Sequence, residues 1–177
     1  MNNAADFNQL LERIGGDVEV LDLTGIIYKV GDEGVSSLST ALVNENNKVT
    51  WLSLSSNKIG DDGVRSLSTA LMNKNNKVIA LNLRENNVGF EGIQSLSKAL
   101  MNENNKVTTL ILWNNRIGDD GARSLSTALM NENNKVTMLN LHSNNIGDDG
   151  VKPLSIALMS ENNKVSTLRS FDYQDRK

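Results

Sequence analysis

Residues 107–135 read VTTLILWNNRIGDDGARSLSTALMNENNK, and this unit of 29 residues recurs along almost the whole chain. An earlier copy at 18–48 is longer by two residues, and VSTLRSF at 165–171 begins a copy that does not finish. Full copies in the same register occupy residues 49–77, 78–106 and 136–164. Self-similarity at a fixed period of about 20–50 residues is typical of solenoids, in which each unit stacks on the next. The sequence therefore predicts a row of stacked units.

Within each unit the hydrophobic period changes from that of a strand to that of a helix. In the copy at 49–77, Leu52 and Leu54 alternate with other residues, which predicts a short strand with one buried face. The GDDG turn that follows offers Asp61 or Asp62 as the N-cap of a helix. The helix itself is indicated by apolar residues at spacings of three and four: Val64, Leu67 and Leu71. The stretch NKNNK then ends the helix and returns the chain.

The pattern LxLxxNxIGxxGxxxLxxAL resembles the leucine-rich repeat of the ribonuclease-inhibitor type and covers residues 18–171. The resemblance implies an α/β leucine-rich-repeat solenoid, a horseshoe arc with a parallel β-sheet on the concave face and α-helices on the convex face. It also implies a ladder of buried hydrogen bonds made by the asparagines at the strand exits: Asn57, Asn86, Asn115 and Asn144. The first copy carries Ile26-Ile27-Tyr28-Lys29 near this position, so we expect the ladder to begin at Asn57.

The chain divides into three parts around these repeats. Solenoid ends must be capped, because a terminal unit has no neighbour to cover its apolar face. Residues 1–17 are predicted to form an N-terminal capping helix, since Phe7, Leu10, Leu11 and Ile14 fall at helical spacing. Residues 18–164 form five repeats, and residues 165–177 form a partial repeat strand with a charged C-terminal tail. No helix is predicted after residue 165, so we expect self-association through the C-terminal end.

Composition excludes several function classes. The formal net charge is −3, and the basic residues are mixed with acidic ones, which argues against nucleic acid as a partner. No apolar stretch or amphipathic anchor indicates a membrane. The chain contains no cysteine, which excludes disulfides and thiolate metal sites. We therefore expect a cytoplasmic protein without a cofactor.

The repeats differ from one another mainly where the strands and their exits lie. The copies at 49–77 and 107–135 differ at seven positions, of which five fall on the strand or its exit. The helical stretch RSLSTALMN is the same in both. Sequence drift at exposed positions would also produce divergence there, and would collect small polar residues such as Ser53 and Ser55. Drift does not readily explain the two tryptophans, the isoleucine and the methionine on the same face.

We therefore predict a protein-binding site on the concave face. Trp, Tyr and Arg dominate the energetic centres of protein interfaces. The predicted central residues are Trp51, Arg84, Ile111, Trp113, Met138 and His142. The predicted rim consists of Lys58, Glu85, Asn114 and Arg116.

Catalysis and metal binding are poorly supported by the residues present. His142 is the only histidine, and its sequence neighbours supply no nucleophile or carboxylate partner for general-base chemistry. The acidic turns at 61–62, 119–120 and 148–149 suggest either a calcium ladder or helix capping. Capping is the better reading, because the copy GFEG at 89–92 loses one of the acids. We predict that the chain is not an enzyme.

The resemblance implies that the chain is a protein–protein interaction module. Nearly identical repeats with no accessory domain resemble an effector or recognition protein of a bacterium or protist. For an effector, the resemblance implies delivery into a host cytoplasm. Two alternatives stay open. One is a structural, self-assembling solenoid, and the other is the substrate-recognition arm of a ubiquitin-ligase-type complex.

Overall fold

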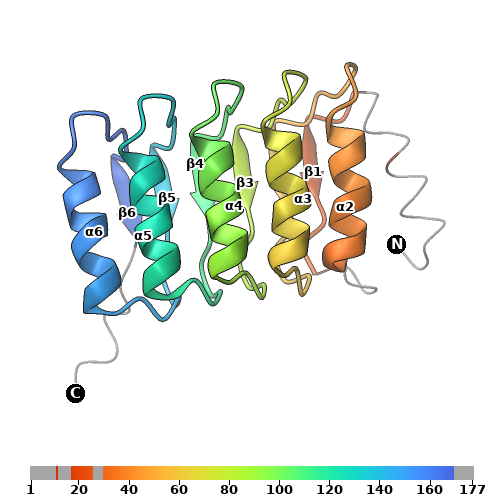
Figure 1. Cartoon of the computed structure of the whole chain (residues 1–177). Helices are drawn as coiled ribbons and strands as arrows, with labels where there is room; N and C mark the ends of the chain where they lie inside the picture. The colour runs from red at the N-terminus through yellow and green to blue at the C-terminus, as the bar shows by residue number, and fades with distance from the viewer. Residues whose placement is uncertain (1–10, 12–16, 26–29, 170–177) are drawn as a thin grey trace.

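The computed structural model describes residues 11, 17–25 and 30–169, which form a two-layer α/β solenoid (Figure 1). One layer is a six-stranded sheet in which each strand pairs in parallel with the next one in the sequence. The register repeats every 29 residues, so that Leu81 lies beside Leu110. The strands are β1 (Val20–Asp22), β2 (Trp51–Ser53), β3 (Ala80–Asn82), β4 (Thr109–Ile111), β5 (Met138–Asn140) and β6 (Thr167–Arg169). The predicted parallel solenoid is confirmed.

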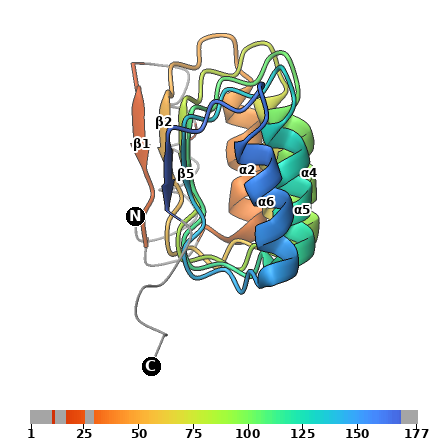
Figure 2. The same cartoon turned by 90° about the vertical axis from the view of Figure 1, so that its left-hand side faces the viewer.

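The second layer is a row of helices, which lies on one side of the sheet (Figure 2). The helices are α2 (Gly31–Leu42), α3 (Asp61–Leu71), α4 (Phe90–Leu100), α5 (Gly118–Leu129) and α6 (Asp148–Leu158). Of the predicted N-terminal cap, Leu11 is helical and packs half-buried against the core. Residues 1–10 and 12–16 lie outside the described residues, and so does the predicted charged tail at 170–177.

Leucines from both layers fill the space between sheet and helices. Each strand buries its alternate leucines against the helices, and each helix buries the leucines at spacings of three and four. Central positions from both layers are fully buried: Leu81, Leu83, Leu96, Leu110, Leu112 and Leu125. The period change seen in the sequence therefore places the core correctly.

A ladder of asparagines connects consecutive strand exits. The amide nitrogen of Asn86 donates to the carbonyl oxygens of Leu54 and Leu83, each at 3.0 Å. Its side-chain oxygen accepts from the backbone N–H groups of Asn57 and Ile59, also at 3.0 Å. The same reach back to the preceding repeat is made by Asn57, Asn115 and Asn144. The expected ladder is thus present from Asn57 onward.

A second asparagine ladder lies at the opposite edge, where the helices end. The side-chain nitrogen of Asn104 donates to the backbone oxygen of Met72, which follows the preceding helix α3, at 3.1 Å. Equivalent bonds are made by Asn75, Asn133 and Asn162 at 3.0–3.1 Å. In the sequence, the NxNNK stretch indicates only the end of a helix. Its middle asparagine also closes the unpaired carbonyls left at a helix C-terminus.

Lysines reinforce this second edge. The ammonium group of Lys106 donates to the backbone oxygen of Asn76 at 2.7 Å, and Lys135 donates to that of Asn105 at 2.6 Å. Burial, followed by repulsion from the neighbouring Lys77 and Lys135, lowers the pKa of Lys106. Each lysine thus binds the loop of the repeat before its own.

The acidic turns do cap helices, but not the helices that we expected. Helix α3 begins at Asp61, and its N-cap residue Gly60 makes no side-chain capping bond. The Asp61 carboxylate instead accepts from the N–H of Gly89, the N-cap of α4, at 2.7 Å. At Gly92 a Cβ would lie 2.6 Å from this carboxylate, so the second glycine of the turn leaves room for the cap. The prediction that Asp61 caps its own helix was wrong, because the carboxylate reaches the next repeat.

Phe90 interrupts this series of caps. Phe90 occupies the position in its repeat that Asp61 and Asp119 occupy in theirs. Its side chain has no oxygen that could accept a hydrogen bond from the backbone N–H of Gly118, the equivalent of Gly89 in the next repeat. Gly118 then adopts φ 64°, whereas the capped Gly60, Gly89 and Gly147 have φ between −93° and −105°. Its N–H bonds to the backbone oxygen of Asn144, and among the described residues the side-chain oxygen of Asn144 is buried without a partner.

The asparagine ladder can be tested with Asn115→Ala. The substitution leaves buried backbone groups of two repeats unpaired, so the free energy of unfolding should fall by roughly 1–3 kcal/mol. Chemical denaturation followed by circular dichroism measures it. Asn87→Ala, at an exposed position of the exit loop in the preceding repeat, is the control and should change stability by less than about 0.5 kcal/mol. Equal losses for both variants would contradict the ladder.

The missing cap can be tested with Phe90→Asp. The new carboxylate should accept from Gly118 as Asp61 accepts from Gly89, and a capping bond is worth about 1 kcal/mol. Phe90→Ala removes the same ring without adding an acceptor and is the matched control. Denaturation should find the aspartate variant more stable than the alanine variant. The inter-repeat cap would be refuted by two variants of equal stability.

Candidate protein-binding surface

The residues predicted to bind lie on the sheet side of the solenoid or on the loops that leave it. We call this side the sheet face: the surface of β1–β6 that points away from the helices, with the segment after each strand. Three of the central residues lie within strands: Trp51, Ile111 and Met138. The other three lie two residues beyond a strand end: Arg84, Trp113 and His142. Half of the predicted central residues therefore belong to the strand exits and not to the strands.

Three of these side chains form a continuous stack across three repeats. The guanidinium carbon of Arg84 lies 3.7 Å from the centroid of the Trp113 ring. On the other side of the stack, the His142 ring meets Trp113 edge-on, with centroids 5.8 Å apart and planes at 62°. A cation over an aromatic face is attracted by the ring quadrupole, by about 0.5–1 kcal/mol at an exposed site. The contacts hold Trp113 in one orientation on the surface.

Glu85 extends this stack to a fourth repeat. One carboxylate oxygen accepts from Arg84 Nε at 3.0 Å and from Nη2 at 2.6 Å. The other accepts from the Ser56 hydroxyl at 2.7 Å. These hydrogen bonds, the one from Ser56 first, lower the pKa of Glu85. Glu85 therefore stays ionised and balances the charge of Arg84.

Apolar side chains lie next to the stack on the same face. Ile111 on β4 is half-buried, and Met138 on β5 is 42% exposed. Trp51 is separate from them, because β2 lies two strands from β4 and Trp51 pairs with Val20 and Ala80. The structure thus brings five of the six predicted central residues onto β3–β5 and their exits, and leaves Trp51 apart.

Two serines on this face are not exposed, contrary to expectation. Ser53 is fully buried and Ser55 is 4% exposed. The Ser53 hydroxyl lies 2.7 Å from that of Thr24 and 3.2 Å from the amide nitrogen of Asn82. These polar side chains of the neighbouring repeats cover the small Ser53 hydroxyl. Their small size therefore reflects packing rather than drift on an open surface.

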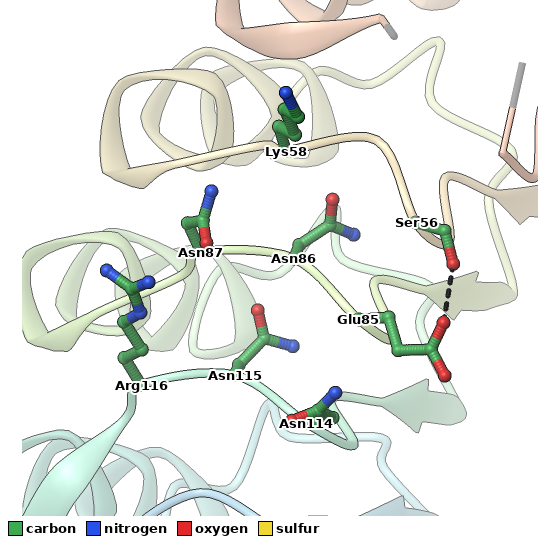
Figure 3. A pocket seen from close by; sticks show the side chains of 8 residues that line it. All are labelled: Ser56, Lys58, Glu85, Asn86, Asn87, Asn114, Asn115 and Arg116. Carbon is green, nitrogen blue, oxygen red and sulfur yellow. Dashed lines mark hydrogen bonds between the residues drawn. The ribbon is translucent and has the colours of Figure 1, made fainter. Parts of the chain in front are cut away.

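The four predicted rim residues line one hollow of about 430 Å³ beside the stack (Figure 3). Lys58 and Arg116 flank Asn87 at one end, and Glu85 points toward Ser56 at the other end. The ladder residues Asn86 and Asn115 form part of the wall. The rim predicted from divergent positions is thus a single concave feature.

The third residue after each of the strands β2–β5 is held in an unusual backbone conformation. Ser56, Glu85, Asn114 and Ser143 all have φ between 54° and 60°. This left-handed region costs energy for residues other than glycine, and asparagine tolerates it best. The ladder asparagines Asn86 and Asn115 directly follow Glu85 and Asn114, and their hydrogen bonds fix the loop in place. The side chains of the rim are therefore presented by a rigid loop.

The described residues offer no support for metal chemistry. No group of three or more His, Asp or Glu side chains in ranges 17–25 and 30–169 is placed to hold a metal ion. In the same part of the chain, no helix has the length and apolar character that crossing a bilayer requires.

A second hollow, of about 440 Å³, lies on the helix side. Its apolar part comes from Met72 and from Phe90, which is 40% exposed. Charged side chains of α3 and α4 surround it, namely Arg65, Glu91 and Lys98. This hollow competes with the sheet face as a binding surface.

The chain is similar to solved structures in fold but to no curated protein in sequence. A search of the curated proteins gives no match. Among 55 matching solved chains is "Leiomodin-1 Actin-Binding Site 2 (ABS2)", with a TM-score of 0.60 and 17% identity. The alignment covers 86% of this chain and 87% of that one. At this identity the similarity shows a shared fold alone.

A family model connects the repeats to known sequences. The model described as "Leucine Rich repeat" matches residues 45–68, 74–97, 103–126 and 132–155. These matches cover more than half of the sequence and coincide with the strand–helix units of the structure. The chain belongs to the leucine-rich repeat family.

Proposed function

We propose that the chain is a protein-interaction module that binds its partner on the sheet face, with Trp113 at the centre. The observation that carries the proposal is the stack of Arg84, Trp113 and His142. Tryptophan and arginine bury large areas at the centres of interfaces, and an anchor already held in place loses little freedom on binding. Leucine-rich repeats in general mediate such interactions.

Size argues that the partner also contacts the rim. Three side-chain columns about 7 Å apart over about 25 Å of sheet present on the order of 350 Å². A standard interface needs about 800 Å² from each partner. The hollow lined by Lys58, Glu85, Asn114 and Arg116 adjoins the stack and supplies additional surface.

The wider setting follows only from the resemblance of the repeats. An effector or recognition protein of a bacterium or protist, and a ubiquitin-ligase recognition arm, would each use this face in the same way. The similarity to an actin-binding site makes actin a first protein to assay directly. Only a direct assay can show whether the chain binds actin, because a shared fold at 17% identity does not imply a shared binding surface.

Trp113→Ala tests the proposal. Loss of a central anchor should weaken binding by about 2 kcal/mol or more, about thirtyfold in Kd, without unfolding the protein. Affinity capture from an extract of the source organism, followed by calorimetry on the captured partner, provides the measurement. Arg123→Ala, on the exposed side of α5, is the control. A partner that ignores Trp113 and Arg84 but loses affinity with helix-side variants at Phe90 or Arg123 would refute the sheet face.

Self-assembly is a second candidate, favoured by the C-terminal end of the solenoid. At the C-terminal end Met159, which directly follows α6, is 78% exposed, whereas its equivalent Met130 in the preceding repeat is 36% exposed. No described strand pairs with the outer edge of β6. The equivalent edge of every earlier strand is covered by the next repeat, so a second copy would continue the same stacking.

Light scattering after size exclusion tests self-assembly. The full chain should form a dimer or larger species as its concentration rises, because exposed apolar side chains favour association. Met159→Glu should restore the monomer, and Ile79→Glu, at another exposed apolar position, should not. A wild-type monomer at every concentration would remove this candidate.

A further inference from the structure

We infer that the partner presents an acidic side chain to the hollow beside Trp113, at the end that Lys58 and Arg116 line. This inference rests on the proposed function and gives the chemistry of the partner segment. The segment would place an apolar or aromatic side chain against Trp113, Ile111 and Met138, and an Asp or Glu next to it in the hollow.

The charge of the hollow is the first reason. Lys58 and Arg116 are exposed, and within the described residues neither forms an ion pair or a side-chain hydrogen bond. They stand on either side of Asn87, whose amide offers a further donor between the two cations (Figure 3). Two exposed cations that line one hollow and have no acidic partner among the described residues make this end of the hollow attractive to an anion.

The only acidic side chain that lines the hollow cannot neutralise these cations. Glu85 points to the other end, toward Ser56. Both of its oxygens are occupied, one by the Arg84 guanidinium and the other by the Ser56 hydroxyl. Glu85 and Arg84 therefore cancel each other, and the positive charge of Lys58 and Arg116 remains.

The carboxylates at the start of the nearby helices are held elsewhere as well. Asp61 and Asp119 accept from the backbone N–H groups of the next repeats. Asp62 pairs with Arg65, and Asp120 pairs with Arg123.

Placement beside the stack favours a peptide segment over a free anion. The hollow and Trp113 are joined by the backbone itself, since Asn114 lines the hollow and directly follows the tryptophan. Glu85 belongs to both features, because it lines the hollow and binds Arg84 over the Trp113 ring. One extended segment can therefore fill both sites with neighbouring residues.

The test uses a displayed library of random peptides selected on the full chain. Peptides that lose binding to Trp113→Ala are synthesised, each beside a copy in which Asp and Glu are replaced by Asn and Gln. Fluorescence anisotropy gives the affinity of each peptide for the wild type and for Lys58→Gln with Arg116→Gln. The control, Lys74→Gln with Lys98→Gln, removes the same charge from exposed lysines off the sheet face.

The selected peptides should be rich in Asp and Glu. The amide copies and the Lys58/Arg116 variant should each lose roughly tenfold in affinity, as two exposed charge contacts would give. The two losses should not add, because both remove the same interaction. Salt should weaken the wild type more than the variant. The Lys74/Lys98 control should bind as the wild type does.

The outcomes separate the two proposals. Peptides that depend on Trp113 but show no acidic preference, or bind the Lys58/Arg116 variant unchanged, overturn the acidic segment and leave the sheet face in place. A library that yields no peptide dependent on Trp113 overturns the proposed function, and the acidic segment with it.

Discussion

The buried backbone of each strand exit must find hydrogen-bond partners, and the rest of the structure depends on how this is done. The exit loops turn inside the stack, where water cannot reach their N–H and C=O groups. One asparagine per repeat satisfies them by donating to the preceding repeat and accepting from it. An unpaired buried group costs about 1–3 kcal/mol, so the ladder fixes both the register and the left-handed residue at each exit.

Other contacts between repeats follow the same rule at the remaining edges. The side-chain amide of Asn104 closes the end of the preceding helix, Lys106 binds the loop of the preceding repeat, and Asp61 caps the following helix. Each of these side chains forms a hydrogen bond to a neighbouring repeat. The exception at Phe90 shows the cost of losing one, because Gly118 changes its backbone conformation and Asn144 keeps an unpaired oxygen.

A scaffold held by its own polar ladders leaves the sheet face free to vary. Arg84 and His142 each contact Trp113, and these three side chains occupy the position that Ser55 has in another copy, outside the leucine core. The rigid exits set the positions of these side chains before any partner arrives. This separation of scaffold and surface explains why the strand exits differ between copies whose helices are nearly identical.

The sequence by itself determined the repeat and the leucine core, because both depend on a period that recurs every 29 residues. Its resemblance to the leucine-rich repeat implied the parallel sheet and the asparagine ladder. It also identified which side chains line the sheet face. Only the tertiary structure decided which repeat each polar side chain serves: Asp61 caps α4 rather than α3. It also showed that Glu85 neutralises Arg84 while Lys58 and Arg116 remain unpaired. These facts depend on contacts between residues about one or two repeats apart, and on the direction of each side chain, which no local pattern contains.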